Sequence, residues 1–174
     1  MQEITCKETL AVQTHLILPS HTNSFGNMFG GQLLAFIDNI SAIAAMRVTR
    51  HRIMTAALDN MNFINPLPER NSVCLECYVS GTGTRSIEVF VKVLGENMLK
   101  HERYIAATSY LTFVVVDDDP DFEMPRIVPE SDEEKLVCEG YEERRQARKI
   151  SRQKDKELQE QLSTGIFWLE DHKK

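Results

Sequence analysis

Long apolar runs are absent from this sequence. No segment approaches the roughly 20 consecutive apolar residues that a helix needs to cross a bilayer, and residues 1–7 contain no apolar stretch that resembles a signal peptide. The sequence therefore predicts a cytoplasmic protein without a membrane partner.

Cysteine is also scarce. The four cysteines, Cys6, Cys74, Cys77 and Cys138, are too few and too scattered for the disulfide framework of a small secreted protein, and we expect them to be reduced. Cys74 and Cys77 form a CxxC pair, but the residues around them are typical of a strand, in which this spacing sends the two side chains to opposite faces. No second ligand pair accompanies them, so no metal site is predicted.

Positive charge is not in excess, since the formal net charge is −6 and the isoelectric point is near 5.4. A protein that neutralises nucleic-acid phosphates over a broad surface needs the opposite balance, so nucleic acid is not an expected partner. An anionic ligand would have to be held in a local pocket. The sequence also has no GxSxG nucleophile motif and no pair of histidines at helical spacing.

The composition is nevertheless sufficient for one buried core, because 42% of the 174 residues are hydrophobic. The pattern of residues changes abruptly near Asp117, and we expect a main domain over residues 1–117 and a charged extension over residues 118–174. Residues 117–143 carry twelve acidic side chains, and a group of basic side chains follows them.

The extension is predicted to be mostly helical. Ser131 and Glu134 have the spacing of a helix capping box, and Gly165 would end the pattern. A charged helix of this kind is either a solvated appendage or a contact between subunits.

The main domain is predicted to contain one strand, one long helix and four further strands. A loop rich in glycine, serine and asparagine, residues 19–31, separates the first strand from the helix. Successive strands after the helix lack helical crossovers, which favours a mainly antiparallel sheet and an α+β domain. The expected strands cover residues 8–18, 53–64, 72–84, 86–95 and 103–116.

The predicted helix, Gly30–Val48, has apolar residues at nearly every angle around its axis. Such a helix is buried on most sides. A sheet of five strands covers one side only, and the remaining apolar surface predicts a second subunit.

Asp38 interrupts this apolar helix and has no partner at helical spacing. Burying an uncompensated carboxylate is costly, so such a group is either used in chemistry or bonded to a neighbouring hydroxyl or backbone group, and residue type alone does not separate these possibilities. The glycine loop, residues 26–31, would present unpaired N–H groups at the helix start, where they suit a developing oxyanion, although an ordinary glycine turn has the same composition. Gly31 and Asp38 lie seven residues, or about 10 Å, apart along a helix, so action on one carbonyl would need two subunits.

Five segments together resemble the hotdog-fold acyl-CoA thioesterases, the group that includes bacterial short-to-medium-chain acyl-CoA hydrolases and the brain-type acyl-CoA hydrolase. The resemblance covers roughly residues 8–117 in unbroken order, and the charged extension lies outside it. The segments are Pro19-Ser20-His21-Thr22-Asn23, Gly26-Asn27-Met28-Phe29-Gly30-Gly31, Phe36-Ile37-Asp38, Met61-Asn62-Phe63-Ile64 and Thr84-Arg85-Ser86.

The resemblance implies a long central helix wrapped by an antiparallel sheet, and dimers with active sites at the subunit interface. It also implies further assembly into a trimer of dimers, that is, a hexamer. The implied substrate is an acyl-CoA, which is hydrolysed to a free fatty acid and CoA, with no cofactor other than the coenzyme A of the substrate itself. The preferred acyl chain length is not indicated.

The resemblance also assigns roles to individual residues. Asn27 would position the thioester or water, Asp38 would act as general base or nucleophile, and the Gly31 N–H would polarise the carbonyl. Substrate contacts are expected from Gly30, Asn62, Phe63, Thr84, Arg85 and Ser86. Two alternatives are a non-catalytic acyl-CoA-binding hotdog module and a hotdog hydratase or dehydratase, which would need a catalytic histidine facing a carboxylate near the helix.

Overall fold

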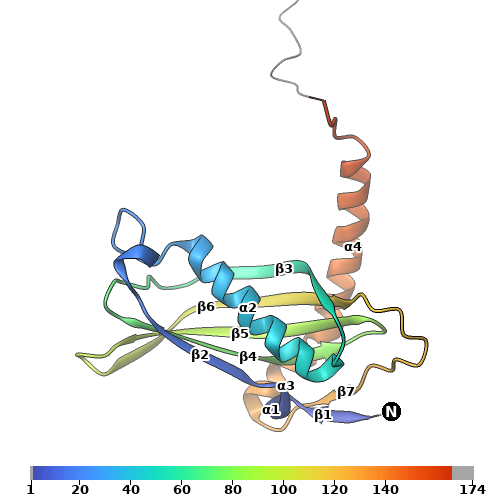
Figure 1. The fold of residues 1–174 in the computed structure, drawn as a ribbon, viewed down its shortest axis with the longest axis horizontal. Coiled ribbons are helices and arrows are strands. Elements are labelled where there is room, and N and C mark those ends of the chain that lie inside the picture. Colours follow the sequence, from blue (N-terminus) through green and yellow to red (C-terminus); the bar gives the residue numbers. More distant parts are fainter. Residues whose placement is uncertain (1, 166–174) are drawn as a thin grey trace, which may run out of the picture. The chain divides into compact units, whose positions relative to one another are not determined.

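A computed structural model describes residues 2–165 of the chain, and Met1 and residues 166–174 lie outside the described residues. The contacts divide the chain into two units, with the division between Glu139 and Gly140. The elements are β1 (Glu3–Thr5), α1 (Cys6–Thr9), β2 (Ala11–Leu16), the short 3₁₀ turn η1 (Pro19–His21), α2 (Gly30–Thr49), β3 (Ile53–Phe63), β4 (Ser72–Thr82), β5 (Ser86–Asn97), β6 (Glu102–Val115), β7 (Arg126–Val128), α3 (Asp132–Glu139) and α4 (Tyr141–Gln159) (Figure 1).

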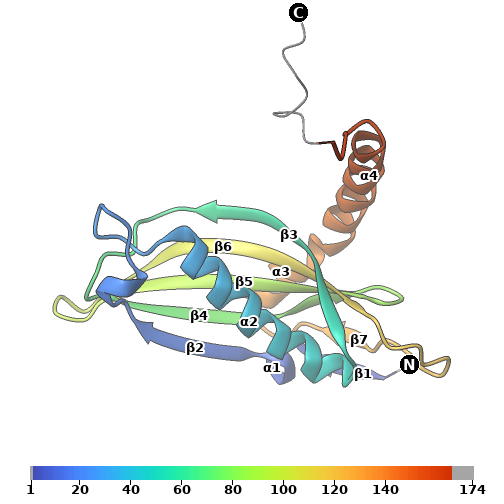
Figure 2. The ribbon, with the colours of Figure 1, turned by 45° about the horizontal axis from the view of Figure 1, so that its top comes forward.

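The first unit is built on a five-stranded sheet in the order β2-β4-β5-β6-β3, in which every neighbouring pair is antiparallel. The long strands β4, β5 and β6 form its centre and are rich in β-branched and aromatic residues, which fit a pleated surface. Helix α2 lies across one face of this sheet in both ribbon views (Figures 1 and 2). The expected α+β architecture, with one long helix against an antiparallel sheet, is confirmed.

Helix α2 packs on the sheet through one side of its surface. Side chains at helical spacing, among them Leu33, Ile37, Ile40 and Ala44, are at most 2% exposed. Each large aliphatic side chain buried in this way contributes about 1.5–3 kcal/mol to the free energy of folding. The helix ends where Arg50 adopts a left-handed conformation and its N–H donates to the carbonyl of Met46.

The first expected strand, residues 8–18, is shorter than its alternating pattern indicates. Residues Cys6–Thr9 form the one-turn helix α1, and β2 begins only at Ala11. A capping box explains the difference, because the side chains of Thr5 and Glu8 each accept a hydrogen bond from the backbone N–H of the other residue. This local bonding overrides the strand pattern at the start of the chain.

The first unit continues beyond residue 117, where the sequence places the boundary of the main domain. Strand β7 pairs in parallel with β1, and α3 contacts β4. A small apolar cluster of Cys6, Tyr78, Phe90 and Val137 accompanies these contacts, and the sulfurs of Cys6 and Cys138 lie 3.6 Å apart. The early part of the acidic segment is therefore bound to the sheet, since its few apolar residues are buried there.

Both helices after residue 130 follow the expected pattern. The capping box of α3 is present, because Ser131 N–H donates to Glu134 Oε2 at 2.9 Å and Glu134 N–H donates to Ser131 Oγ at 3.2 Å. Helix α4 has no buried residue and is supported by pairs along its surface such as Glu142 with Arg145. No helix within residues 2–165 is both long and apolar enough to span a bilayer.

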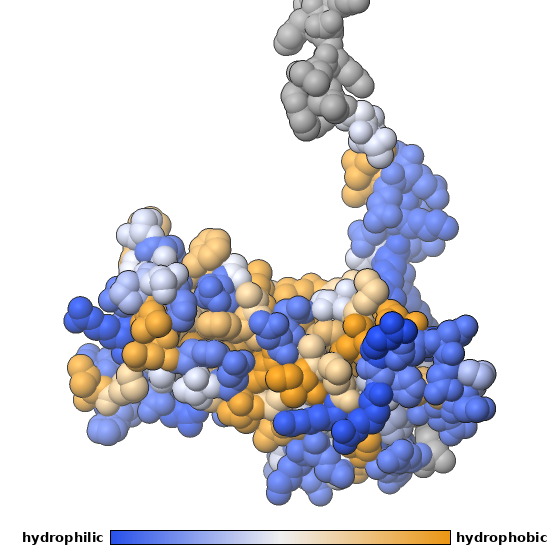
Figure 3. Space-filling view, viewed as in Figure 1, coloured by the Kyte–Doolittle hydropathy of each residue, from blue (hydrophilic) through white to orange (hydrophobic). Residues whose placement is uncertain are grey.

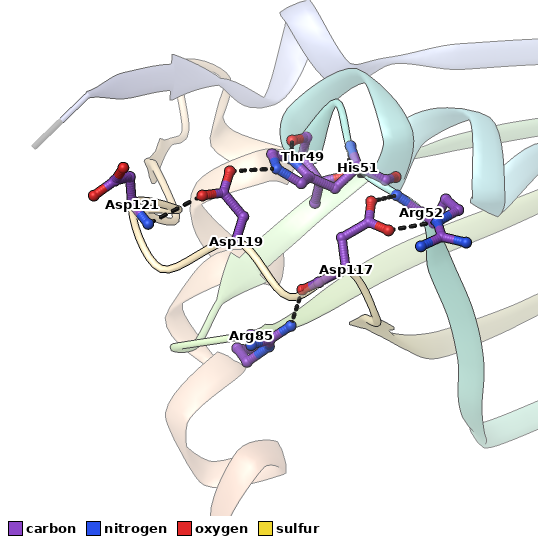
Figure 4. A network of polar contacts seen from close by, with 7 residues as sticks. All are labelled: Thr49, His51, Arg52, Arg85, Asp117, Asp119 and Asp121. Carbon is purple, nitrogen blue, oxygen red and sulfur yellow. Dashed lines mark hydrogen bonds and ion pairs between the residues drawn. The ribbon is translucent and has the colours of Figure 1, made fainter.

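A polar network fixes the segment that follows β6 against the end of α2 (Figure 4). The His51 ring contacts the carbonyl of Thr49 through Nδ1 at 2.5 Å and the carboxylate of Asp119 through Nε2 at 3.0 Å. Since a carbonyl and a carboxylate both accept, protons on both ring nitrogens satisfy both contacts, and these surroundings favour the imidazolium form of His51. The Thr49 carbonyl and the Asp119 carboxylate accordingly raise the pKa of His51.

Asp117 extends the network toward the turn between β4 and β5. Its carboxylate accepts from the backbone N–H of Arg52 at 2.7 Å and from the Arg52 guanidinium, and its backbone carbonyl accepts from Arg85. The N–H and guanidinium of Arg52 lower the pKa of Asp117. The network therefore joins the segment after β6 to the start of β3 and to the turn before β5.

The protonated state of His51 makes the stability of the first unit depend on pH. We expect the stability advantage of the wild type over His51→Gln to be complete below about pH 6.5, the ordinary histidine pKa. As the pH rises through the raised pKa of His51, the advantage should decline, because the folded state gives up its extra proton. Urea unfolding at a series of pH values from about 6 to about 9 measures this difference.

His101→Asn is the matched control, because His101 is exposed and its backbone is left-handed, a conformation that asparagine tolerates. A difference between wild type and His51→Gln that stays constant over this pH range would contradict an imidazolium at position 51.

Candidate active site

The loop that leads into α2 is held in one shape by its own hydrogen bonds. Asn23 Oδ1 accepts from the N–H groups of Phe25 at 2.9 Å and Asn27 at 3.3 Å, and Met28 N–H donates to the carbonyl of Leu67 at 2.8 Å. The φ of Gly26 is +70°, a backbone conformation that residues with a side chain rarely adopt. The loop therefore presents its backbone in a fixed arrangement at the start of the helix.

The first N–H groups of α2 are unpaired, as the sequence predicts. The amides of Gly30 and Gly31 donate to no acceptor within residues 2–165. A Cβ at Gly31 would lie 2.5 Å from a ring carbon of Phe29, so a side chain there would displace that ring. Together with the helix dipole, these donors form a small region that favours negative charge on a ligand oxygen.

A pocket of about 310 Å³ opens beside this helix start. The residues that line it are mostly apolar, and Asn27 is one of the few polar ones. The pocket is lined by Asn27, Met28, Leu33, Phe63, Ile64, Asn65, Pro66, Leu67 and Ala106. The structure thus brings Asn27 and Phe63, two of the expected site residues, to the same place, and Phe63 also lies over Gly30.

Asp38 is half-buried on α2 and bonded to a residue that the sequence did not single out. Its Oδ1 accepts from the hydroxyl of Thr55 on β3 at 2.8 Å, and no other contact of this carboxylate is found among residues 2–165. The bond to a neighbouring hydroxyl, which the sequence offers as the structural alternative to a role in chemistry, is therefore present for one oxygen, and the second carboxylate oxygen has no partner among residues 2–165. The sequence alone does not indicate which helix residue a hydroxyl on a strand will contact.

The remaining expected residues lie elsewhere. Asn62 is exposed at an irregularity of β3, where its Nδ2 donates to the carbonyl of Asn60 at 3.1 Å. Thr84, Arg85 and Ser86 lie at the far end of the sheet. Ser86 pairs with Val114, and the next residue of β6 pairs with Ile53, the first residue of β3. Within one chain, this turn and the glycine loop are at opposite ends of α2.

Among residues 2–165, the guanidinium of Arg85 donates only to backbone carbonyls. Its guanidinium donates to the carbonyl of Val115 at 3.3 Å and to the carbonyl of Asp117 (Figure 4). Its side chain is nevertheless exposed. Among residues 2–165, no group of three or more histidine, cysteine, aspartate or glutamate side chains is placed to hold a metal ion.

The side of α2 that faces away from the sheet carries exposed apolar residues. Figure 3 shows hydrophobic areas, interrupted by hydrophilic ones, where α2 crosses the sheet in Figure 1. The side chains of Ile43 and Met46 on α2 are 50% and 51% exposed, and those of Met54 and Leu58 on the edge strand β3 are 63% and 40% exposed. A continuous apolar surface of this kind marks an interaction site.

Comparison with known proteins places these features in a family. The family model described as "Thioesterase superfamily" matches residues 25–100. An uncharacterized acyl-CoA thioester hydrolase of Bacillus subtilis is 40% identical over 164 residues, which cover 94% of this chain and 95% of that protein.

Solved structures agree with the sequence comparison. The acyl-CoA hydrolase from Staphylococcus aureus in complex with butyryl coenzyme A, coenzyme A and coenzyme A disulfide is 33% identical, has a TM-score of 0.85, and the match covers 91% of this chain and 97% of that one. Structures of the same hydrolase exist with an aspartate, a threonine or an asparagine replaced by alanine. An apo-hexameric acyl-CoA thioesterase is 35% identical with a TM-score of 0.81, and the match covers 87% of this chain and 97% of that one.

The similarity extends over nearly the whole chain in both sequence and fold, and includes the glycine loop and the long helix. This protein therefore belongs to the hotdog-fold acyl-CoA thioester hydrolases of the thioesterase superfamily.

Proposed function

We propose that this protein hydrolyses acyl-CoA thioesters to a carboxylic acid and coenzyme A, at active sites that two subunits build together. The proposal rests on one observation: Asp38, within an otherwise apolar helix, is held by the Thr55 hydroxyl through one oxygen only. A carboxylate fixed in this way at the border of a hydrophobic surface is suited to proton transfer or to attack on a carbonyl.

The chemistry needs few groups, because a thioester carbonyl is already electrophilic. One group must polarise the carbonyl oxygen, and another must activate water or attack the carbonyl itself. The Gly31 N–H supplies the first function and Asp38 supplies the second. The bond from Thr55 orients the carboxylate and leaves Oδ2 for the water or the carbonyl carbon.

The two groups act across a subunit interface. Gly31 and Asp38 of one chain are about 10 Å apart along α2, too far to contact the same carbonyl. The uncovered apolar side of α2 supports a neighbouring subunit whose glycine loop approaches Asp38. In this arrangement each active site uses the loop of one chain and the helix carboxylate of the other.

The asparagine of the site is best assigned by spacing. In the Staphylococcus aureus hydrolase, the replaced asparagine precedes the replaced aspartate by fifteen residues, and the replaced threonine follows that aspartate by seventeen. Asn23, Asp38 and Thr55 have the same two spacings here. We therefore propose Asn23 as a member of the active site in addition to Asn27, the asparagine expected from the sequence.

The other expected residues would bind the substrate. Gly30 and Phe63 lie beside the glycine loop, where the apolar pocket suits an acyl or pantetheine chain, and Asn62 precedes Phe63 on β3. Thr84, Arg85 and Ser86 would contact the phosphates of coenzyme A from another chain of the assembly. The opposite placement of these groups within one chain is compatible with a site built from two chains.

The first test is the hydrolysis of acetyl, butyryl, hexanoyl, lauroyl and palmitoyl coenzyme A, followed with a thiol reagent. We expect thiol release by the wild type, and a loss of roughly 10²–10⁴-fold in kcat for Asp38→Ala and Asp38→Asn, because general acid-base catalysis contributes about this much. Asn39→Ala, a change to the exposed neighbouring residue, should retain wild-type turnover.

Size-exclusion chromatography should show the same assembly for all of these variants. Wild-type rates for the Asp38 variants on every substrate would remove Asp38 from the chemistry. Binding of acyl-CoA by the wild type without thiol release would instead indicate a non-catalytic binding module.

The two asparagines can be separated by their kinetics. Asn23→Ala should lower kcat by at least about tenfold, because it removes a group near the reacting carbonyl and loosens the loop. Asn27→Ala should mainly raise KM, since Asn27 lines the pocket. Steady-state kinetics with butyryl coenzyme A measure both constants, and the reverse pattern would return the catalytic role to Asn27.

We also propose that the protein forms dimers that assemble further into a trimer of dimers, in the cytoplasm. The hexameric thioesterases among the structural relatives support the larger assembly. The exposed apolar residues on α2 and β3 support the dimer.

Ile43→Glu tests the dimer, because it places a charge on the uncovered side of α2. We expect the assembly to dissociate and thiol release to be lost, while the circular dichroism of the folded chain is retained. Leu99→Glu, which alters the 95% exposed side chain of the turn between β5 and β6, is the matched control and should keep the wild-type mass by light scattering. An Ile43→Glu protein with unchanged mass would place the subunit contact elsewhere.

A further inference from the structure

Two histidines enclose Phe36 on the side of α2 next to the glycine loop. The ring of His15 stacks on that of Phe36 with centroids 4.1 Å apart and planes inclined by 6°. The ring of His21 meets Phe36 edge-on, at 5.7 Å and 90°. Aromatic pairs in these geometries attract one another beyond their burial alone.

The three rings come from three elements that meet at the proposed site. His15 lies on β2, which is an edge strand of the sheet, and pairs opposite Val73. Phe36 precedes Asp38 by two residues on α2, and His21 precedes Asn23 by two residues at the end of η1. The stack therefore connects the chain segment that carries Asn23 to the helix that carries Asp38.

His21 also holds the loop through hydrogen bonds. Its backbone carbonyl accepts from Phe29 N–H at 2.8 Å, directly before the helix start, and its Nδ1 accepts from Leu18 N–H at 3.4 Å. His21 therefore ties the residue before η1 and the residue before α2 to the same turn.

The surroundings of His15 favour its neutral state. Its Nε2 is buried and has no partner within residues 2–165. The groups that face it are Val73 from β4, Phe36 from α2 and His21 from η1, so His21 is the titratable group among them. Burial first, and the nearby His21 second, lower the pKa of His15.

We propose that His15 and His21 are positioning residues for hydrolysis: through their ring contacts with Phe36, they hold the Asn23 loop in register with the helix that carries Asp38. This inference rests on the proposed function for its catalytic consequence. Neither histidine needs to touch the substrate, because each acts through Phe36 and the loop backbone.

The arrangement makes the loop sensitive to acid. A proton on His15 places a charge on a ring that stacks on Phe36 and whose Nε2 has no partner among residues 2–165. Since the pKa of His15 is lowered in the folded state, the ordered loop is favoured above the ordinary histidine pKa of about 6.5 and is lost as the pH falls through the lowered value.

The test compares His15→Ala, which removes the ring, with His15→Phe, which keeps a ring but cannot titrate. At neutral pH we expect His15→Ala to lower kcat on the order of tenfold with KM changed less than about twofold, as loss of positioning does. His15→Phe should restore kcat and make the acid side of the kcat profile shallower. His101→Asn, at an exposed histidine, should match the wild type throughout.

Hydrogen exchange of the amides in residues 19–31 tests the stack without any need for turnover. After correction for intrinsic exchange, we expect His15→Ala to speed exchange on the order of tenfold, and the wild type to lose protection in acid while His15→Phe keeps it. If the wild type releases no thiol but this exchange pattern appears, the proposed function is wrong, while the role of the two histidines in ordering the loop is supported. Equal loop protection in the wild type, His15→Ala and His15→Phe at every pH, or an unchanged kcat for His15→Ala, would overturn the inference.

Discussion

The structure depends on a mismatch between one helix and the surface available to cover it. Helix α2 is apolar on most sides, but the five-stranded sheet covers one of them, burying the row from Leu33 to Val48 and leaving Ile43 and Met46 exposed. Exposed apolar surface is unfavourable in water, and the proposed subunit contact would cover it. Asp38 is partly buried on the same helix and bonded to Thr55.

The two ends of α2 carry polar groups of different kinds. At its start, unpaired amides, a φ of +70° at Gly26 and a rigid loop create a region that attracts negative charge. At its end, His51 and Asp117 are committed to bonds with neighbouring residues, and that region serves mainly to fix the segment after β6. The groups proposed for catalysis thus lie near the start and middle of the helix, and an internally bonded network lies at its end.

The sequence predicts the features that depend on local pattern. Periodicity locates α2 and the four later strands closely, and the Ser131 and Glu134 spacing locates the capping box of α3. Features that depend on contacts between distant segments are missed. The hydroxyl of Thr55, the pairing of β1 with β7 and the stacking of His15 on Phe36 arise only when the sheet brings those residues together. Where two local signals compete, as at residues 5–9, the capping box wins over strand alternation because its hydrogen bonds form within one turn.

The pairing of β1 with β7 has a consequence for how the chain is made. Glu3 and Arg126 are 123 residues apart in sequence, yet they form an ion pair within this two-stranded sheet. On the ribosome, β1 emerges first and has no strand to pair with until nearly the whole unit has been translated. The cluster around Cys6, Tyr78 and Phe90 stays open to solvent for even longer, because Val137, which completes it, is synthesised after β7. Closure of this side of the sheet is therefore a late folding step, and its timing is set by chain length and not by the speed of local pairing.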